Sequence, residues 1–150
     1  MSTTSDTSTT TLRELLDEKG RDVWDIHPDD SVFNAVTKMS IKDCGGLLVM
    51  EDDKIVGIIT ERDYTRNVIL KGKTSPETPV RDIMTADVIC VEPDKTVTEC
   101  LEIMTEQHVR HLPVLEGGKV AGMVSIGDLV KRIIADQKAA LQVLQGSGTK

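Results

Sequence analysis

The sequence predicts an α+β fold in which a β-α-β-β-α unit occurs twice, with the copies packed about a pseudo-twofold axis and a long C-terminal helix. Three observations support this prediction: an internal duplication, the same order of apolar segments in both copies, and a helical apolar pattern near the C-terminus. Residues 22–66 align with residues 87–131 without a gap, and 12 of the 45 aligned pairs are identical. Two copies favour pairwise packing, because a solenoid needs three or more repeats.

Each copy begins with a short apolar run that a proline ends, at residues 23–26 and at residues 88–91. A helix is expected next. Thr96 and Glu99 have the spacing of a capping box, and Ser31 has the same capping position in the first copy. After both caps the apolar residues recur at intervals of three and four, which is the spacing of one helical face.

Two short strands around a polar turn are expected to complete each copy. The four predicted strands are residues 46–50, 55–59, 112–115 and 120–124. Apolar runs on either side of a polar turn are typical of β-hairpins. We expect a second helix to start directly after each hairpin, at Thr60 and at Ser125.

The boundaries of the parts follow from this arrangement. We expect a disordered Ser/Thr tail at 1–11, repeat 1 at 12–70, a linker at 71–79, repeat 2 with its helix at 80–145, and a flexible tail at 146–150. The last helix is expected to run from about Ile126 to Gln145, where Gly146 ends it. Its distal apolar residues are either a packing surface for another subunit or part of a frayed tail.

The composition of the 150 residues excludes several classes of protein. A net charge of −7 argues against non-specific binding of nucleic acid, and no apolar run is long enough to span a membrane. The N-terminus lacks the basic start and apolar stretch of a secretory signal. The three cysteines show no Cys-x-x-Cys spacing, and no His/Cys/Asp cluster has the spacing of metal ligands. We therefore expect reduced thiols, a cytoplasmic location and no metal site.

One motif at the end of each hairpin carries chemistry. Thr60-x-x-Asp63 and Ser125-x-x-Asp128 lie where a strand ends and a helix begins. The free N–H groups of a helix N-terminus suit a phosphate, and an ionised Asp can accept from both vicinal hydroxyls of a ribose. The same pattern is also ordinary helix capping, so both interpretations stay open.

The duplicated pattern resembles a pair of cystathionine-β-synthase (CBS) domains, known as a Bateman module. The resemblance rests on VRDIMT at 80–85, RHLPV at 110–114, and the strand ends GIITERD at 57–63 and GMVSIGD at 122–128. It leaves no room for an attached enzyme or channel, so the chain is similar to the free-standing bacterial form. It implies homodimers, and an adenine nucleotide (AMP, ADP, ATP or NAD(H)) or S-adenosylmethionine held in clefts between the copies.

The resemblance also implies the ligand-binding residues. Thr60 and Ser125 would contact phosphate, and Asp63 and Asp128 would hold the ribose. Arg110 and His111 would contact phosphates, whereas the first copy has Gly45 and Gly46 at these positions, so we do not expect the two sites to be equivalent. Arg62 would either reach a phosphate or pair on the surface with a neighbouring carboxylate. The adenine would lie against apolar strand residues such as Ile26, Leu47, Val91 and Leu112, which are otherwise simply core residues. Gly46 and Pro113 are also expected among the ligand-binding residues.

We therefore expect a regulatory, energy-sensing module for signal transduction that binds an adenine nucleotide and acts on an unknown downstream protein. The alternatives are a structural dimerisation or adaptor module without a ligand, and a sensor of S-adenosylmethionine. An enzyme is not expected, because the sequence shows no nucleophile–base pair and no metal set. No membrane or nucleic-acid partner is expected.

Overall fold

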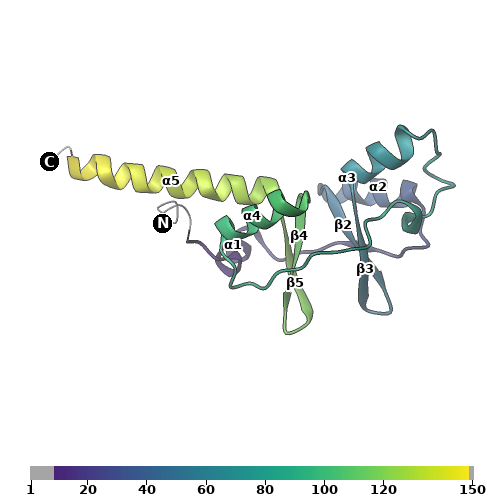
Figure 1. Cartoon of the computed structure of the whole chain (residues 1–150), viewed down its shortest axis with the longest axis horizontal. Helices are drawn as coiled ribbons and strands as arrows, with labels where there is room; N and C mark the ends of the chain where they lie inside the picture. The colour runs from purple at the N-terminus through teal and green to yellow at the C-terminus, as the bar shows by residue number, and fades with distance from the viewer. Residues whose placement is uncertain (1–8, 149–150) are drawn as a thin grey trace. The chain divides into compact units, whose positions relative to one another are not determined.

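The computed structural model describes residues 9–148, and these residues form two compact units. The central unit is Val23–Ile89. The terminal unit joins the N-terminal residues through Asp22 to the residues from Cys90 onward. Figure 1 shows the strands and helices of both units.

The central unit contains a three-stranded sheet. Its elements are β1 (Asp25–Ile26), α2 (Val32–Lys42), β2 (Gly46–Glu51), β3 (Lys54–Thr60), α3 (Glu61–Tyr64), a π-helical segment (Thr65–Ile69) and a 3-10 turn (Val80–Asp82). In the sheet order β1-β2-β3, β1 runs parallel to β2, and β2 runs antiparallel to β3.

Within the described residues, the terminal unit contains a two-stranded sheet and three helices. Its elements are α1 (Leu12–Lys19), α4 (Val97–Gln107), β4 (His111–Glu116), β5 (Lys119–Ser125) and α5 (Ile126–Gly148). The expected strand at 88–91 is reduced to a single parallel bridge between Val91 and Val114, because only Val91 of that run exchanges backbone hydrogen bonds with β4. This corrects the predicted first strand of the second copy.

The backbone repeats the duplication in detail. Both hairpins carry an irregularity at the same point, after Val49 in one and after Val114 in the other. Asp43 and His108 both end their helices in the left-handed conformation, at φ 53° and φ 57°. The turns of the two hairpins also match, with positive φ at Asp52, Asp53, Gly117 and Gly118. The predicted α+β pair of repeats with a long C-terminal helix is confirmed.

In each compact unit, the segment that precedes one sequence repeat packs on the other repeat. We call these two the exchanged segments. The segment that precedes repeat 1 packs on repeat 2: Thr11 forms a bridge with Thr96, and Leu12 N donates to Lys95 O at 2.9 Å. The segment that precedes repeat 2 packs on repeat 1 in the same way, since Ser31 forms a bridge with Pro79 and Val80 N donates to Asp30 O at 2.8 Å. The repeats and the compact units therefore divide the chain differently.

Each unit has an aliphatic core, as the near absence of aromatic residues predicts. The core of the central unit is Ile26, Val32, Ala35, Met39, Leu47, Val49, Ile59, Val68, Val80 and Ile83. The buried residues of the terminal unit include Leu12, Leu15, Leu16, Val97, Cys100, Met104, Leu112, Val114, Val124 and Leu129. The predicted caps are also present: Ser31 accepts from Asn34 N, and Thr96 forms a full capping box with Glu99.

The ends of the chain differ in part from expectation. Thr10 is buried and Thr11 caps α1, so the expected disordered tail does not extend to these residues; residues 1–8 and 149–150 lie outside the described part. α5 does not end at Gln145 but continues to Gly148, because an isolated glycine costs a helix only about 1 kcal/mol. Figure 1 shows α5 extending past the strands of its own unit. None of the described helices has the length and apolar character needed to cross a membrane.

Candidate functional site

The first candidate site is the turn between β3 and α3 in the central unit. Asp63 N donates to Thr60 Oγ1 at 3.2 Å, and Asp63 Oδ2 accepts from Thr60 N at 2.9 Å and from Thr60 Oγ1 at 3.0 Å. This is a complete capping box, so the capping interpretation is correct. The second carboxylate oxygen is less engaged, since Oδ1 has only a long contact of 3.5 Å with Thr85 Oγ1.

The surroundings of Asp63 leave its carboxylate able to accept further hydrogen bonds. Partial burial raises the pKa of Asp63, and the hydrogen bonds from Thr60 and Thr85 offset this rise only in part. A half-buried carboxylate with one lightly bonded oxygen gains more from new hydrogen-bond donors than a fully solvated one. Asp63 can therefore both cap α3 and accept from a bound hydroxyl group.

The second candidate site is the turn between β5 and α5 in the terminal unit. It has the same reciprocal bonds, since Asp128 N donates to Ser125 Oγ at 3.2 Å and Ser125 N donates to Asp128 Oδ2 at 2.8 Å. Here, however, Lys19 Nζ also lies 2.6 Å from Asp128 Oδ2 and donates to Met123 O at 3.0 Å. Burial raises the pKa of Asp128, but the bonds from Lys19 and Ser125 outweigh it and hold the pKa below its ordinary value.

The residue that faces each turn across the hairpin differs between the units. Gly46 pairs with Thr60, whereas His111 pairs with Ser125. His111 Nδ1 is buried and has no hydrogen-bond partner among the described residues. Burial lowers the pKa of His111, with Asp128 acting in the opposite direction, so its ring is neutral near pH 7 and would meet a phosphate as an N–H donor. Arg110 is exposed beside it.

The other predicted residues lie in less accessible places. Leu47 and Leu112 are fully buried, and Gly46 and Pro113 are buried beside them in the strands. Arg62 is partly exposed in α3. The structure thus brings Gly46, Thr60 and Asp63 together in one unit, and His111, Ser125 and Asp128 together in the other. It does not show the side chains of Leu47 and Leu112 open to a ligand.

Sequence reasoning missed two residues that touch the site carboxylates, Lys19 and Thr85. Each belongs to the exchanged segment that precedes the other repeat in sequence, and so each is far along the chain from its carboxylate. The signal that could have found them is the three-residue offset that aligns residues 12–16 with residues 80–84. That offset was visible, but nothing in the sequence indicated which repeat each segment covers.

One cluster in the central unit corrects the expectation that no group of potential metal ligands exists. Ligand atoms of His27, Asp29 and Glu51 all lie within 4.8 Å of one another, because β1 and β2 are parallel neighbours. His27 Nδ1 already accepts from Asp29 N at 3.0 Å, and one Asp29 carboxylate oxygen is bound by Arg81. These contacts engage His27 Nδ1 and Asp29 Oδ1, two of the possible ligand atoms.

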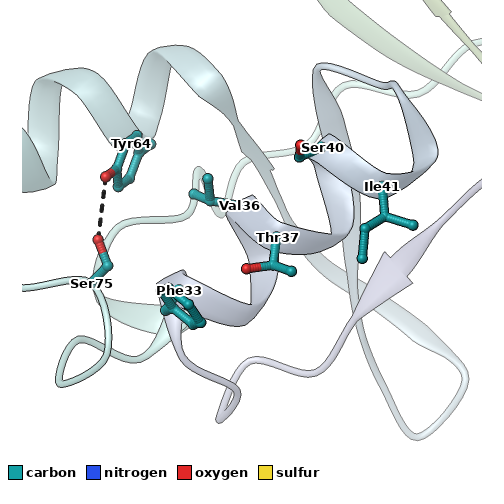
Figure 2. A pocket seen from close by; sticks show the side chains of 7 residues that line it. All are labelled: Phe33, Val36, Thr37, Ser40, Ile41, Tyr64 and Ser75. Atoms are coloured by element: carbon teal, nitrogen blue, oxygen red, sulfur yellow. Dashed lines mark hydrogen bonds between the residues drawn. The ribbon is translucent and has the colours of Figure 1, made fainter.

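A groove of about 310 Å³ lies on the central unit, and none of the predicted binding residues lines it. Figure 2 shows the side chains that line it, on α2, on the helix that carries Tyr64 and on the following segment. They are Phe33, Val36, Thr37, Ser40, Ile41, Tyr64 and Ser75. Ser75 Oγ donates to Tyr64 Oη at 3.3 Å, and Phe33 and Ile41 are 53% and 73% exposed.

Comparison with known proteins agrees with these features. The family model of the CBS domain matches residues 20–69 and 80–135. The crystal structure of the CBS domain protein NE2398 is 52% identical, with a TM-score of 0.79, and the match covers 83% of this chain and 98% of that one. A protein with CBS domains from Burkholderia ambifaria MC40-6, provisionally described as a signal-transduction protein, is 49% identical, with a TM-score of 0.82 and coverage of 85% and 96%. The mitochondrial protein CBSX3 of Arabidopsis thaliana is 37% identical over 145 residues, which are 90% of this chain and 70% of CBSX3.

Proposed function

Because the chain belongs to the CBS-domain family and carries two copies of the domain, we propose that it is a regulatory module for signal transduction that binds adenine nucleotides. The ligand would be AMP, ADP, ATP or NAD(H). The two solved relatives support a binding role rather than a catalytic one, since the chain covers nearly all of each. The provisional description of the Burkholderia protein supports signal transduction.

The observation that carries this proposal is the half-buried carboxylate of Asp63. Its Oδ1 atom has only the 3.5 Å contact with Thr85, and its raised pKa reflects loss of water without full replacement by donors. The vicinal hydroxyls of a ribose would supply such donors. Gly46, opposite Thr60, has no side chain, so the backbone of β2 is uncovered by a Cβ atom at this position.

The test separates ligand binding from capping. Binding of AMP, ADP, ATP and NAD(H) would be measured by isothermal titration calorimetry on the wild-type chain, with S-adenosylmethionine as the rival ligand. Asp63→Ala is expected to abolish binding at the central unit. The matched control is Glu99→Ala, which removes the same kind of capping box from α4, outside the proposed sites, and should leave binding intact. Equal binding by both variants would contradict the role of Asp63.

Exposed apolar side chains favour a second function, self-association. On α5, Leu141, Val143 and Leu144 are between 54% and 69% exposed, and the groove of the central unit exposes Phe33 and Ile41. Surfaces of this kind are typical of protein interfaces. We propose that the chain forms a homodimer, with or without a nucleotide. Sedimentation of the wild-type chain and of Leu141→Glu would test this, since a dimer held by α5 should dissociate in the variant.

A further inference from the structure

The inference concerns one ion pair that the duplication does not repeat, and it rests on the proposed binding of nucleotides. Other contacts of the exchanged segments occur in both units. Arg13 pairs with Asp94 in the terminal unit, and Arg81 pairs with Asp29 at the corresponding positions of the central unit. Leu16 and Met84 occupy the same place beside Gly122 and Gly57. The two units are therefore close copies around the site carboxylates.

The contact that breaks this pattern is the one between Lys19 and Asp128. With the offset that matches Leu16 to Met84, the counterpart of Lys19 is Asp87, which is exposed. The central unit therefore has an acid where the terminal unit has a cation, and the exchanged segment offers Asp63 the hydroxyl of Thr85 instead of an ammonium. The site carboxylate of the terminal unit is ion-paired. Asp63 is influenced by the charge of the neighbouring Arg62 but forms no ion pair with a described residue.

The position of Lys19 determines what a ligand must supply. Asp128 Oδ2 already accepts from Lys19 and from Ser125 N, at 2.6 and 2.8 Å. The two partners are only partly exposed, with side-chain exposures of 36% for Lys19 and 26% for Asp128. A ribose that takes over Asp128 Oδ2 would leave the Lys19 ammonium without its carboxylate in a partly desolvated place, which is unfavourable.

A phosphate on the same ligand removes this penalty, because it offers the displaced ammonium a new anionic partner. The charges of Lys19 and Arg110 both act on His111, so the surroundings of this turn add positive charge and the N–H donor of a neutral imidazole. A neutral nucleoside offers no replacement anion. The sulfonium and ammonium groups of S-adenosylmethionine outweigh its single carboxylate, so this ligand brings a net positive charge to the Lys19 ammonium.

We propose that Lys19 is the specificity-determining residue of the terminal unit, which makes the Ser125–Asp128 site select phosphorylated adenine ligands over adenosine and S-adenosylmethionine. The Thr60–Asp63 site has no such residue and discriminates less. Selection is thus supplied by the N-terminal helix α1 rather than by the strand–helix motif itself.

The experiment compares AMP with adenosine by calorimetry in the Asp63→Ala background, where only the terminal site remains. Lys19→Met keeps the length and apolar stem of the side chain but removes its charge, and we expect the preference for AMP to fall by about tenfold. Lys19→Arg should retain the preference. The matched control is Arg21→Met, which removes a cation near the end of the same helix that pairs with Asp17 instead.

The outcomes separate this inference from the proposed function. If both ligands bind and Lys19→Met leaves the ratio of their affinities unchanged, the role of Lys19 is refuted while nucleotide binding stands. If Arg21→Met lowers the ratio of the AMP and adenosine affinities as much as Lys19→Met does, the preference reflects the overall charge of the chain rather than Lys19, and the inference is also refuted. If AMP and adenosine both fail to bind to the wild-type chain, the inference is wrong. The proposed function is wrong as well if ADP, ATP and NAD(H) also fail to bind.

Discussion

Gly122 and Leu16 offer a sharp test of the exchanged packing in the terminal unit. A Cβ atom added to Gly122 would lie 2.7 Å and 2.8 Å from the two terminal methyl carbons of Leu16, closer than real Cβ contacts allow. Leu16 belongs to α1 and is fully buried, so it has little room to move away. Gly122→Ala should therefore destabilise the unit through a clash with a residue more than a hundred positions earlier.

The magnitudes follow from the two kinds of packing defect. Gly122→Ala overfills the core and should cost about 2 kcal/mol. Leu16→Ala leaves a cavity and should cost about 3 kcal/mol. In the double variant the truncated Leu16 makes room for the new methyl group, so the total should stay near 3 kcal/mol rather than reach the sum of the single costs.

The assay uses a probe that belongs to the same unit. Cys100 is a buried thiol of the terminal core, and its labelling by a thiol reagent reports the free energy of opening that unit. Trp24 is the single tryptophan of the chain and lies in the central unit, so its fluorescence during urea unfolding reports that unit separately. The free energy of opening should be measured by Cys100 labelling in the wild-type chain, the two single variants and the double variant, which together form a double-mutant cycle. Strictly additive costs would refute the contact between α1 and β5.

The corresponding cycle in the central unit should behave differently. A Cβ atom on Gly57 would lie 2.6 Å from Met84 Sδ, but also 3.0 Å from the backbone oxygen of Thr85. Met84→Ala removes only the first of these contacts. We therefore expect Met84→Ala to rescue Gly57→Ala less completely than Leu16→Ala rescues Gly122→Ala, and full rescue would contradict this geometry.

Four further predictions concern single residues. The folded pKa of Asp128 is lowered, so its stabilising contribution is present above the unfolded pKa of 3.8 and is lost as the pH falls through the folded value. In Asp128→Asn the urea midpoint should therefore fall less on acidification than it does in the wild-type chain. The folded pKa of Asp63 is raised, so its contribution to stability is lost as the pH rises through that value. In Asp63→Asn the urea midpoint should change less with pH over this range. Thr11→Ala should cost about 1 kcal/mol by removing the cap of α1, measured by thermal unfolding; no change would mean that the cap is not formed. Burial and the nearby Glu99 raise the pKa of Cys100 to about 11, so its thiol should react only after unfolding, and rapid labelling of the native chain would contradict this.

The local features of the fold could be read from the sequence because they depend on neighbouring residues. The repeated periodicity predicted the helices and hairpins, and the Thr96–Glu99 pattern predicted its capping box, which the structure contains. The Thr60-x-x-Asp63 turn was also found, together with its capping alternative, since both depend on a strand that runs directly into a helix. Nucleotide binding at that turn remains a prediction.

The contacts that distinguish the two sites could not be read in this way, because they join segments far apart in sequence. A short amphipathic helix such as α1 can cover either of two similar hairpins, and the local pattern does not say which. Folding decides it by burying Leu16 against Gly122, and this choice places Lys19 beside Asp128. Periodicity and spacing thus specified the repeated unit, whereas long-range packing set the charge of each site, since electrostatic interactions depend on distance in space rather than along the chain.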